Sequence, residues 1–301
     1  MPVNTFVERV YEVVSAGRVL EVRAGSEFVS RWDEIARHLP GVPRDGLGPG
    51  SDTSTTAVRL PRGARVGDVR RLLNAQLHLL HLAHGTLCLH AVALRDPAGG
   101  RVVVLLGGHG AGKTLVALAL FQRGWRAMAG DVTLMDCSAD GLSPRVVGGT
   151  AAFLARPGPT RRWFPDLVPR VADEDRVDLS CLPGLWEPPS EPGLVVAAVL
   201  VDVDGDPAAG GGAVEALDGH TAATVWWRAS GHLLERLLDD TPVVLRLLED
   251  DAAATRRLSL VRDLACKIPL HAAWGAPAPI ADRIERLAHI GMLRPVAEGS
   301  S

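Results

Sequence analysis

The chain has 301 residues, of which 47 % are hydrophobic and 22 % are charged, and its formal net charge is −3. This balance lacks the basic surplus that is typical of nucleic-acid-binding proteins, so DNA and RNA are excluded as principal partners. The best transmembrane candidate, residues 194–201, is far shorter than the roughly 20 apolar residues needed to cross a bilayer, so no membrane partner is expected.

The cysteines and the first residues indicate the cellular compartment. The four cysteines form no Cys-x-x-Cys pair, which argues against a disulfide framework and against a thiolate zinc site. They are Cys88, Cys137, Cys181 and Cys266. The chain begins without the basic and apolar regions of a secretory signal peptide. We therefore expect a cytoplasmic protein.

Residues 1–60 are expected to form a small N-terminal α/β segment. An apolar helical face extends over residues 28–39, and the stretch 40–54 is rich in glycine and proline and predicts a loop. The β-forming runs of this segment are 10–14, 19–22 and 56–60.

Residues 61–290 are expected to form the main α/β domain. It opens with a helix at 66–84, because apolar residues recur there at i, i+3 and i+4 spacing. Two β-like runs, 86–94 and 101–107, are separated by turn-forming residues and predict a β-hairpin. The second run enters a glycine-rich octet, and a helix at 115–122 follows it.

The rest of the domain is expected to alternate strands and helices. The predicted elements are strands at 132–135 and 195–203, helices at 221–228 and 243–264, a C-terminal amphipathic helix at 279–290, and loops at 182–193 and 204–213. Residues 291–301 are expected to be a flexible tail. The sequence contains no internal repeat.

The octet 107–114 reads GGHGAGKT and matches the phosphate-binding pattern G-x-x-x-x-G-K-[ST] in full. Glycines allow successive main-chain N–H groups to form an anion-binding nest at a helix N-terminus. We expect Lys113 to reach the β- and γ-phosphates and Thr114 to bind Mg²⁺. The pattern predicts an ATP and Mg²⁺ site formed by Gly107, Gly108, His109, Gly110, Ala111, Gly112, Lys113 and Thr114.

The use of lysine supports this interpretation. Among 32 lysine and arginine residues, lysine occurs only at Lys113 and Lys267. A bulky planar guanidinium does not fit inside a phosphate nest, whereas a compact ammonium does. Lysine is therefore retained at the position where arginine cannot replace it.

A triphosphate site also needs an acidic residue for the metal, and two stretches offer one. The apolar run at 195–204 is typical of a strand that ends in a metal-binding aspartate, here Asp202 or Asp204. The stretch 125–136 offers Asp131, one short strand after the helix that follows the octet. We favour Asp131 because of this chain order and because of a family resemblance.

Residues 89–136 resemble the HPr kinase/phosphorylase family and its relatives, including kinase-like proteins associated with peptide-modification gene clusters. The shared order is a strand ending in Leu-His (His90), a hairpin, the octet 107–114, a helix closing in Arg-Gly (Arg123 and Gly124), and an acidic pair before the next strand (Asp131). The resemblance implies an α/β, HPr kinase-like P-loop fold with a mixed sheet and flanking helices.

The same resemblance implies roles for individual residues. His90 is expected beside the γ-phosphate, and Thr114 and Asp131 are expected to hold Mg²⁺. The family's general base is the first acid of the pair, a position occupied here by Gly130. Three interpretations remain: Asp131 or His90 takes the proton, another carboxylate such as Asp136 or Asp202 reaches the site, or nucleotide is bound with little turnover.

Several other side chains have both a structural and a functional interpretation. The histidines His78, His81 and His84 are interpreted as a partly exposed helix face, with metal binding as the alternative. His109 is either a phosphate contact or an exposed loop residue. The pair of Trp226 and Trp227 is expected to pack a helix against the sheet.

A proline-broken loop is expected at 155–162. It carries Arg156, Arg161 and Arg162, which we interpret as solvated basic residues, with contact to phosphate or to an acidic peptide as the alternative.

These observations predict an ATP- and Mg²⁺-dependent kinase of the serine-kinase type, with His90 and Asp131 as candidate catalytic residues. The expected acceptor is a Ser or Thr hydroxyl of a peptide or protein, with a small molecule as the alternative. A catalytically weak ATP-binding regulatory or assembly protein, and a plain ATPase, are the rival functions. Assembly into a homo-oligomer is left open.

Overall fold

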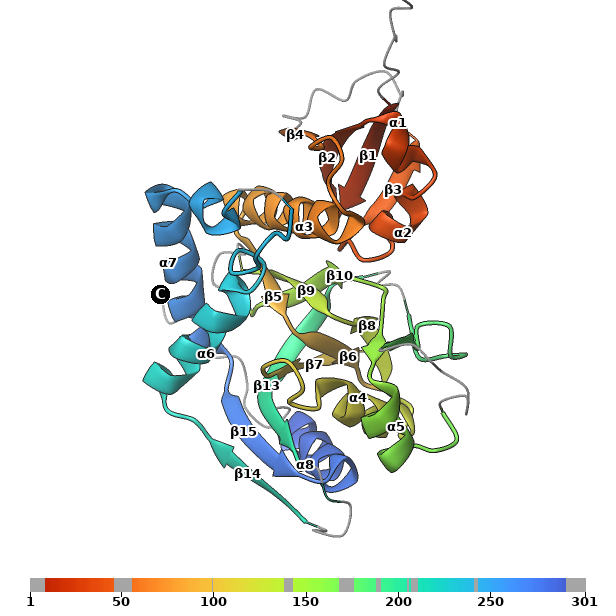
Figure 1. Ribbon diagram of the computed structural model, residues 1–301. Coiled ribbons are helices and arrows are strands. Elements are labelled where there is room, and N and C mark those ends of the chain that lie inside the picture. The colour runs from red at the N-terminus through yellow and green to blue at the C-terminus, as the bar shows by residue number, and fades with distance from the viewer. Residues whose placement is uncertain are drawn as a thin grey trace, which may run out of the picture.

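The computed structural model describes residues 9–45, 56–98, 100–137, 143–167, 176–187, 191–204, 206, 211–240 and 243–290. Its main body is a mixed β-sheet with helices on both faces, and a small second sheet lies at one end, beyond helix α3 (Figure 1). The chain is therefore α/β, as expected. The predicted C-terminal tail, 291–301, lies outside the described residues.

The small sheet is N-terminal and has the strand order β3-β1-β2-β4. Its strands are β1 (Arg9–Ser15), β2 (Arg18–Ala24), β3 (Val42–Asp45) and β4 (Thr56–Arg59). The β-forming runs predicted for this segment are confirmed. The predicted loop at 40–54 is wrong over β3, which pairs antiparallel with β1 at the edge of the sheet, where Pro43 is tolerated. Residues 46–54 of that loop lie outside the described residues.

The single helix predicted at 28–39 is also wrong. The structure has two short helices, α1 (Ser26–Val29) and α2 (Trp32–Ala36), separated by a turn. Both Phe28 and Trp32 are buried, and the Trp32 ring stacks on Tyr11 with ring centroids 4.1 Å apart. The apolar periodicity indicated the buried face correctly but gave no sign of the turn.

Helix α3 (Val66–Ala83) confirms the predicted helix and lies between the two sheets (Figure 1). The N-terminal sheet packs on one side of it, where Val13, Leu20, Leu73 and Leu77 share one apolar cluster. On the other side, Leu82 belongs to the core of the main sheet. One helix thus contributes to both cores.

This position corrects the interpretation of the histidines on α3. His78 and His81 are fully buried rather than partly exposed, and the His81 Nε2 lies 2.7 Å from the Ser15 hydroxyl oxygen. Burial lowers the pKa of His78 to about 3 and that of His81 to about 4. His84, which follows the helix, is exposed. The N-terminal sheet, at Ser15, and the helical segment that carries Arg246 and Arg257 thus enclose a face that the sequence pattern left polar.

The main sheet has nine strands, with the order β5-β9-β10-β13-β7-β6-β8 and with β15 and β14 added beside β13. They are β5 (Thr86–His90), β6 (Val92–Arg95), β7 (Arg101–Leu106), β8 (Arg126–Ala129), β9 (Val132–Asp136), β10 (Arg145–Gly149), β13 (Gly193–Val203), β14 (Gly212–Ala216) and β15 (Leu270–Gly275). Strands β7, β13 and β15 are parallel, so their carboxyl ends lie at one edge.

The predicted hairpin is present as β6 and β7, which pair antiparallel. The run 86–94 is not one strand, however. It divides at Ala91, so β5 pairs with β9 while β6 pairs with β7 and β8. Strands β8, β10, β14 and β15 were not predicted, and β14 begins inside the predicted loop at 204–213.

Helices cover both faces of the main sheet. Helices α4 (Lys113–Phe121) and α8 (Pro277–Ile290) pack on the face that carries Val103 and Leu105, while α6 (Gly219–Gly231) and α7 (Asp251–Lys267) pack on the face that carries Val102 and Val104. Trp226 is fully buried in the second layer, which confirms its predicted packing role.

The helix predicted at 243–264 starts later than expected. Residues Leu245–Leu248 form a 3₁₀ turn, and α7 begins at Asp251 after Asp250, whose side chain accepts a hydrogen bond from the main-chain N–H of Ala253. This is the cap that an aspartate provides at a helix N-terminus. Among the described residues, none of the helices has the length and apolar character required to span a membrane.

Candidate functional site

The glycine-rich loop, residues 107–112, connects β7 to α4 at the carboxyl edge of the parallel strands. Gly107, Gly110 and Gly112 have φ angles of 149°, 86° and 91°, which L residues with a side chain rarely adopt. A Cβ built on Gly112 lies 2.3 Å from the Val203 Cγ2, and the main-chain N–H of Val203 donates to the Ala111 oxygen at 2.9 Å. The end of β13 therefore holds the loop in place.

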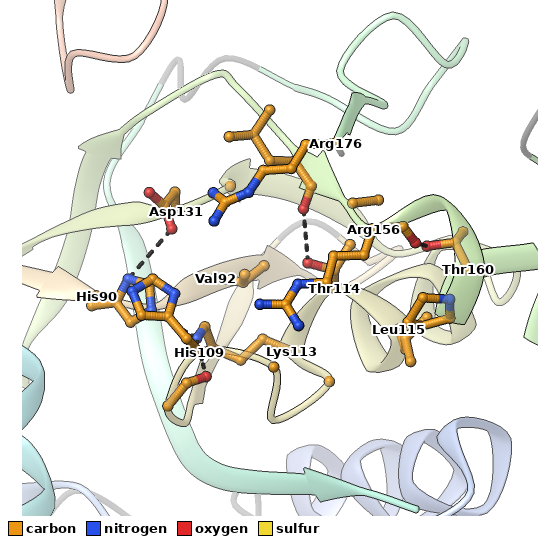
Figure 2. Close-up of a pocket in the computed structure, with 17 residues that line it drawn as sticks. His90, Val92, His109, Lys113, Thr114, Leu115, Asp131, Arg156, Thr160 and Arg176 are labelled. Carbon is orange, nitrogen blue, oxygen red and sulfur yellow. Dashed lines mark hydrogen bonds and ion pairs between the residues drawn. The ribbon is translucent and has the colours of Figure 1, made fainter. Parts of the chain in front are cut away.

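The loop forms one wall of a cavity of about 140 Å³ (Figure 2). Gly108 and Gly110 line this cavity, and a Cβ built on Gly108 meets no atom within 4 Å. The first N–H groups of α4, from Lys113 to Leu115, have no acceptor inside the helix and lie at the same wall. The wall thus offers main-chain donors and space for an anion.

Lys113 is buried at the base of this loop. Its ammonium Nζ donates to the main-chain oxygens of Gly107 and Gly108 at 2.7 and 3.2 Å, and lies 2.9 Å from the His90 Nε2. Burial lowers the pKa of Lys113 to about 8, so the side chain is still mostly charged at neutral pH. Because an ammonium only donates, the Nε2 of His90 must accept, and its other ring nitrogen, Nδ1, carries the proton.

That proton faces Asp131. The His90 Nδ1 lies 3.3 Å from the Asp131 Oδ1 (Figure 2). Partial burial raises the pKa of the Asp131 carboxyl, but His90 and the Lys113 charge outweigh it and hold the pKa well below its usual range. Lys113, His90 and Asp131 therefore form one chain of polar contacts across the cavity. Their spacing in the sequence did not by itself predict these direct contacts.

Two more histidines lie against His90. The rings of His232 and His90 stack with centroids 4.0 Å apart, and His109 lies at 5.0–5.1 Å from both. Burial and the neighbouring His90 lower the pKa of His232 to about 3, so this ring is neutral. His109 is exposed, as one of its two interpretations expects, and its Nε2 lies 3.1 Å from the Arg236 Nη1; because it also lines the cavity, contact with phosphate stays a prediction.

One nitrogen from each of these three histidines lies within 4.8 Å of the other two, a grouping that a transition-metal ion could use. Two of the rings, however, face a cation: His90 faces Lys113, and His109 faces Arg236. These positive charges oppose the binding of a metal cation. The oxygens of Thr114 and Asp131 are the ligand type that Mg²⁺ prefers.

The predicted metal-binding residues are brought to the same cavity. Thr114 and Asp131 both line it, and the Thr114 hydroxyl donates to the main-chain oxygen of Leu154 at 3.2 Å. Asp202 and Asp204 are exposed at the end of β13 and do not line it, and Asp136 lies at the far end of β9 from Asp131. The alternative in which Asp136 or Asp202 reaches the site is therefore wrong.

Gly130 also lines the cavity; the resemblance to the HPr kinase family predicted that it stands where those proteins have a general base. A Cβ built on it lies 2.2 Å from the main-chain oxygen of Ala152 and 3.2 Å from the Phe153 Cα. The backbone at 152–153 thus occupies the space that a side chain at 130 needs. The backbone therefore leaves no room for a carboxylate side chain at position 130.

Arg156 is exposed, as its solvated interpretation expects, and its contact with phosphate or an acidic peptide stays a prediction. It lines the cavity and extends over the glycine-rich loop, with its Nη1 3.6 Å from a Cβ built on Gly110 (Figure 2). The proline-broken loop expected around it is wrong, because Pro157 is the first residue of a helix, α5 (Pro157–Trp163), and proline suits that position. Arg161 and Arg162 lie within α5 and do not line the cavity.

Sequence reasoning did not find Arg176, His232 or Arg236. Arg176 and Arg156 project into the cavity from segments that follow β10 (Figure 2), and His232 and Arg236 follow α6. None of them lies in a recognisable motif, and only the fold brings them to residues more than 50 positions away.

Comparison of the sequence with protein-family models and with curated proteins found no match. The function of this cavity is therefore inferred from its geometry and its chemistry.

Proposed function

We propose that this chain is an ATP- and Mg²⁺-dependent kinase with an HPr kinase-like P-loop fold, which transfers a phosphoryl group to a hydroxyl. One observation supports this above the others: the chain of contacts from Lys113 through His90 to Asp131 begins at a glycine-rich loop and crosses the cavity beside it. Phosphoryl transfer depends mainly on positioning and charge neutralisation, and these residues supply both.

The loop fits a polyphosphate. Its donors come from the main chain of the loop and from the start of α4, where the helix dipole favours negative charge. Lys113, at the base of the loop, and Arg156, beside Gly110, add positive charge. These groups would bind and orient the phosphates and neutralise the charge that develops on them.

Magnesium fits the same cavity. Thr114 supplies a hydroxyl and Asp131 a carboxylate that stays ionised throughout the physiological pH range, because its pKa is well below the usual value. Bound there, the ion would neutralise charge on the β- and γ-phosphate oxygens. The remaining steps depend on side chains of the chain itself.

His90 would take the proton of the acceptor hydroxyl once Lys113, whose ammonium occupies the lone pair of Nε2 in this structure, turns to the phosphates of bound ATP. Its Nε2 is unprotonated, and Asp131 behind Nδ1 fixes the ring and stabilises the charge that protonation creates. Gly130 leaves no room for the family's carboxylate. A histidine supported by an aspartate replaces it in this proposal, and general-base assistance of this kind is typically worth roughly 10²–10⁴-fold in rate.

The closed position at Gly130 also favours a second candidate function, a nucleotide-binding protein with little turnover. Both candidates require Mg-ATP to stabilise the fold. They differ because a kinase releases ADP and labels an acceptor, whereas a binder does neither, and a plain ATPase releases phosphate without any acceptor.

The test combines thermal unfolding with a transfer assay. Mg-ATP at 100 times its Kd is expected to stabilise the wild-type chain by about 2.7 kcal/mol. Lys113→Ala should abolish that stabilisation, while Lys267→Ala, at the end of α7, should keep it. If the Lys113→Ala variant is stabilised as much as the wild type, the nucleotide site is wrong.

The transfer assay follows labelled phosphate from ATP into serine-containing peptides and into water. His90→Asn should reduce transfer by about 10²-fold or more while the stabilisation by Mg-ATP persists. Equal transfer by the His90→Asn variant would refute the role of this histidine. Binding without any turnover by the wild-type chain would favour the second candidate.

A further inference from the structure

A second and larger cavity, of about 500 Å³, adjoins the glycine-rich site. The two cavities share Asp131, Leu154 and Arg176. Helix α3 and His38 form one side of the second cavity, and the segment after α6 forms the other, with His232, Leu233 and Arg236. We call it the arginine cleft, because its lining includes Arg70, Arg71, Arg176 and Arg236.

Only one of these four arginines has an acidic partner among the described residues. Arg71 binds Asp68 and Asp239 at 2.9 and 3.0 Å. No carboxylate of the described part of the chain lies within ion-pair distance of Arg70, Arg176 or Arg236. In that part of the chain, Asp131 is the one acidic residue that lines the cleft. The cleft therefore carries a concentrated positive charge.

The ionisation of the cleft residues reflects this charge. Burial is the main cause that lowers the pKa of Arg70 and of Arg236. Glu34 opposes this shift at Arg70 and Asp131 opposes it at Arg236, while Arg71 and Arg176 lower the pKa of both. Burial and then Arg70 lower the pKa of His38, so this histidine adds no charge of its own at neutral pH. Positive groups that are half-buried and repel one another are stabilised when an anion binds between them.

Guanidinium groups bind carboxylates and phosphates through a planar fork of donors, which suits either anion. A cavity of this volume falls in the range of roughly 300–1,000 Å³ that is typical of small-ligand sites. Asp131 lies where the two cavities meet, next to His90 (Figure 2). A ligand in the cleft could thus present a hydroxyl to His90 while its anionic group contacts the arginines.

We infer that the arginine cleft binds the phosphoryl acceptor and that this acceptor carries a carboxylate or phosphate group close to its reacting hydroxyl. This inference rests on the proposed kinase function. It narrows the acceptor to an anionic hydroxyl compound, whose source is either an acidic serine-containing peptide segment or a small phosphorylated or carboxylated molecule.

Calorimetric titration at low salt tests the inference with three probes. They are the pentapeptides Asp-Asp-Ser-Asp-Asp and Ala-Ala-Ser-Ala-Ala, and glycerol 3-phosphate. At least one anionic probe should bind more than tenfold more tightly than the neutral peptide, and which one binds distinguishes a peptide from a small-molecule source. Raising the salt concentration should weaken this binding, because the contact is between charges.

Variants link the binding to the cleft. Arg70→Gln and Arg176→Gln should each weaken the anionic probe about tenfold or more, because each removes a charge-assisted contact. Arg283→Gln, on the exposed face of α8, removes the same charge elsewhere and should leave the affinity unchanged. Melting temperatures of all three variants show that each is folded.

Two outcomes would overturn the inference: no preference for either anionic probe over the neutral peptide, or equal affinity in the wild type and the two cleft variants. Arg70 does not line the glycine-rich site, so Arg70→Gln should keep the stabilisation by Mg-ATP. If the wild-type chain shows no such stabilisation, the proposed function itself fails, whatever the anionic probes do.

Discussion

Replacing Gly130 with alanine tests whether this position is closed by the backbone. A Cβ at 130 meets the Ala152 oxygen at 2.2 Å, so the segment must retreat by about 1.2 Å to reach the 3.4 Å of ordinary contact. The same segment is held by Thr150, whose oxygen accepts from the Gly130 N–H at 2.9 Å, and by Phe153 in the core. Overpacking of this kind typically costs about 1–3 kcal/mol, which is the expected loss of stability.

Urea unfolding measures this loss, with Gly219→Ala as the matched control. Gly219 is the first residue of α6, and a Cβ there meets no atom within 4 Å, so alanine should leave stability unchanged or raise it by up to about 1 kcal/mol. The Thr150 hydroxyl accepts from the N–H of Asp131 at 3.0 Å, so the displaced segment should also weaken binding of Mg-ATP. A Gly130→Ala variant as stable as the wild type would refute the argument, and so would a Gly130→Asp variant with raised transfer activity.

Three further predictions concern the core and the metal. Glu249 and Arg257 form a buried pair with atoms 2.6 Å apart, so Glu249→Ala should cost roughly 3–5 kcal/mol in urea unfolding, and a loss below 1 kcal/mol would contradict it. The pKa of His78 is about 3 in the folded chain, against 6.5 for the free side chain. Below pH 6.5 this side chain therefore binds a proton in the unfolded chain but not in the folded chain, so His78 alone should lower stability by about 2 kcal/mol between pH 7.5 and pH 5, and His78→Leu should reduce the total fall by that amount. Asp131→Asn should abolish the contribution of Mg²⁺ to ATP binding in thermal unfolding, whereas Asp202→Asn should leave it intact, and the reverse result would move the metal site to the end of β13.

The sequence predicted those parts of the site that depend on local chemistry. A glycine-rich loop between a strand and a helix follows from residue types over eight positions, and Lys113 and Thr114 have fixed places within it. Asp131 was favoured because of its place in the chain order, and the structure brings it to the same cavity as the loop. Such features need no knowledge of the tertiary packing.

The parts that were missed depend on contacts between distant segments. His232 and Arg236 reach the site because α6 packs on the sheet next to β5, and no local pattern records that packing. The burial of His78 and His81 has the same origin, since each is polar in sequence and is enclosed by layers formed elsewhere in the chain. The closed space at Gly130 likewise depends on residues 152–153, which lie more than 20 positions away.

The lack of space for a side chain at position 130 and the contact between His90 and Asp131 both affect the charge of the same carboxylate. A carboxylate at 130 would be a second negative group beside Asp131, in a cavity where the Asp131 carboxylate already lies 3.3 Å from His90. Because the backbone at 152–153 occupies that space, residue 130 places no acidic side chain next to Asp131. The charge of Asp131 is therefore available to His90 and to a metal ion. The contacts then have a direction: Lys113 donates to Nε2, and Nδ1 faces the Asp131 carboxylate at 3.3 Å. Once Lys113 turns to the phosphates of a bound nucleotide, a proton taken up at Nε2 would create a cation next to that carboxylate, which balances its charge.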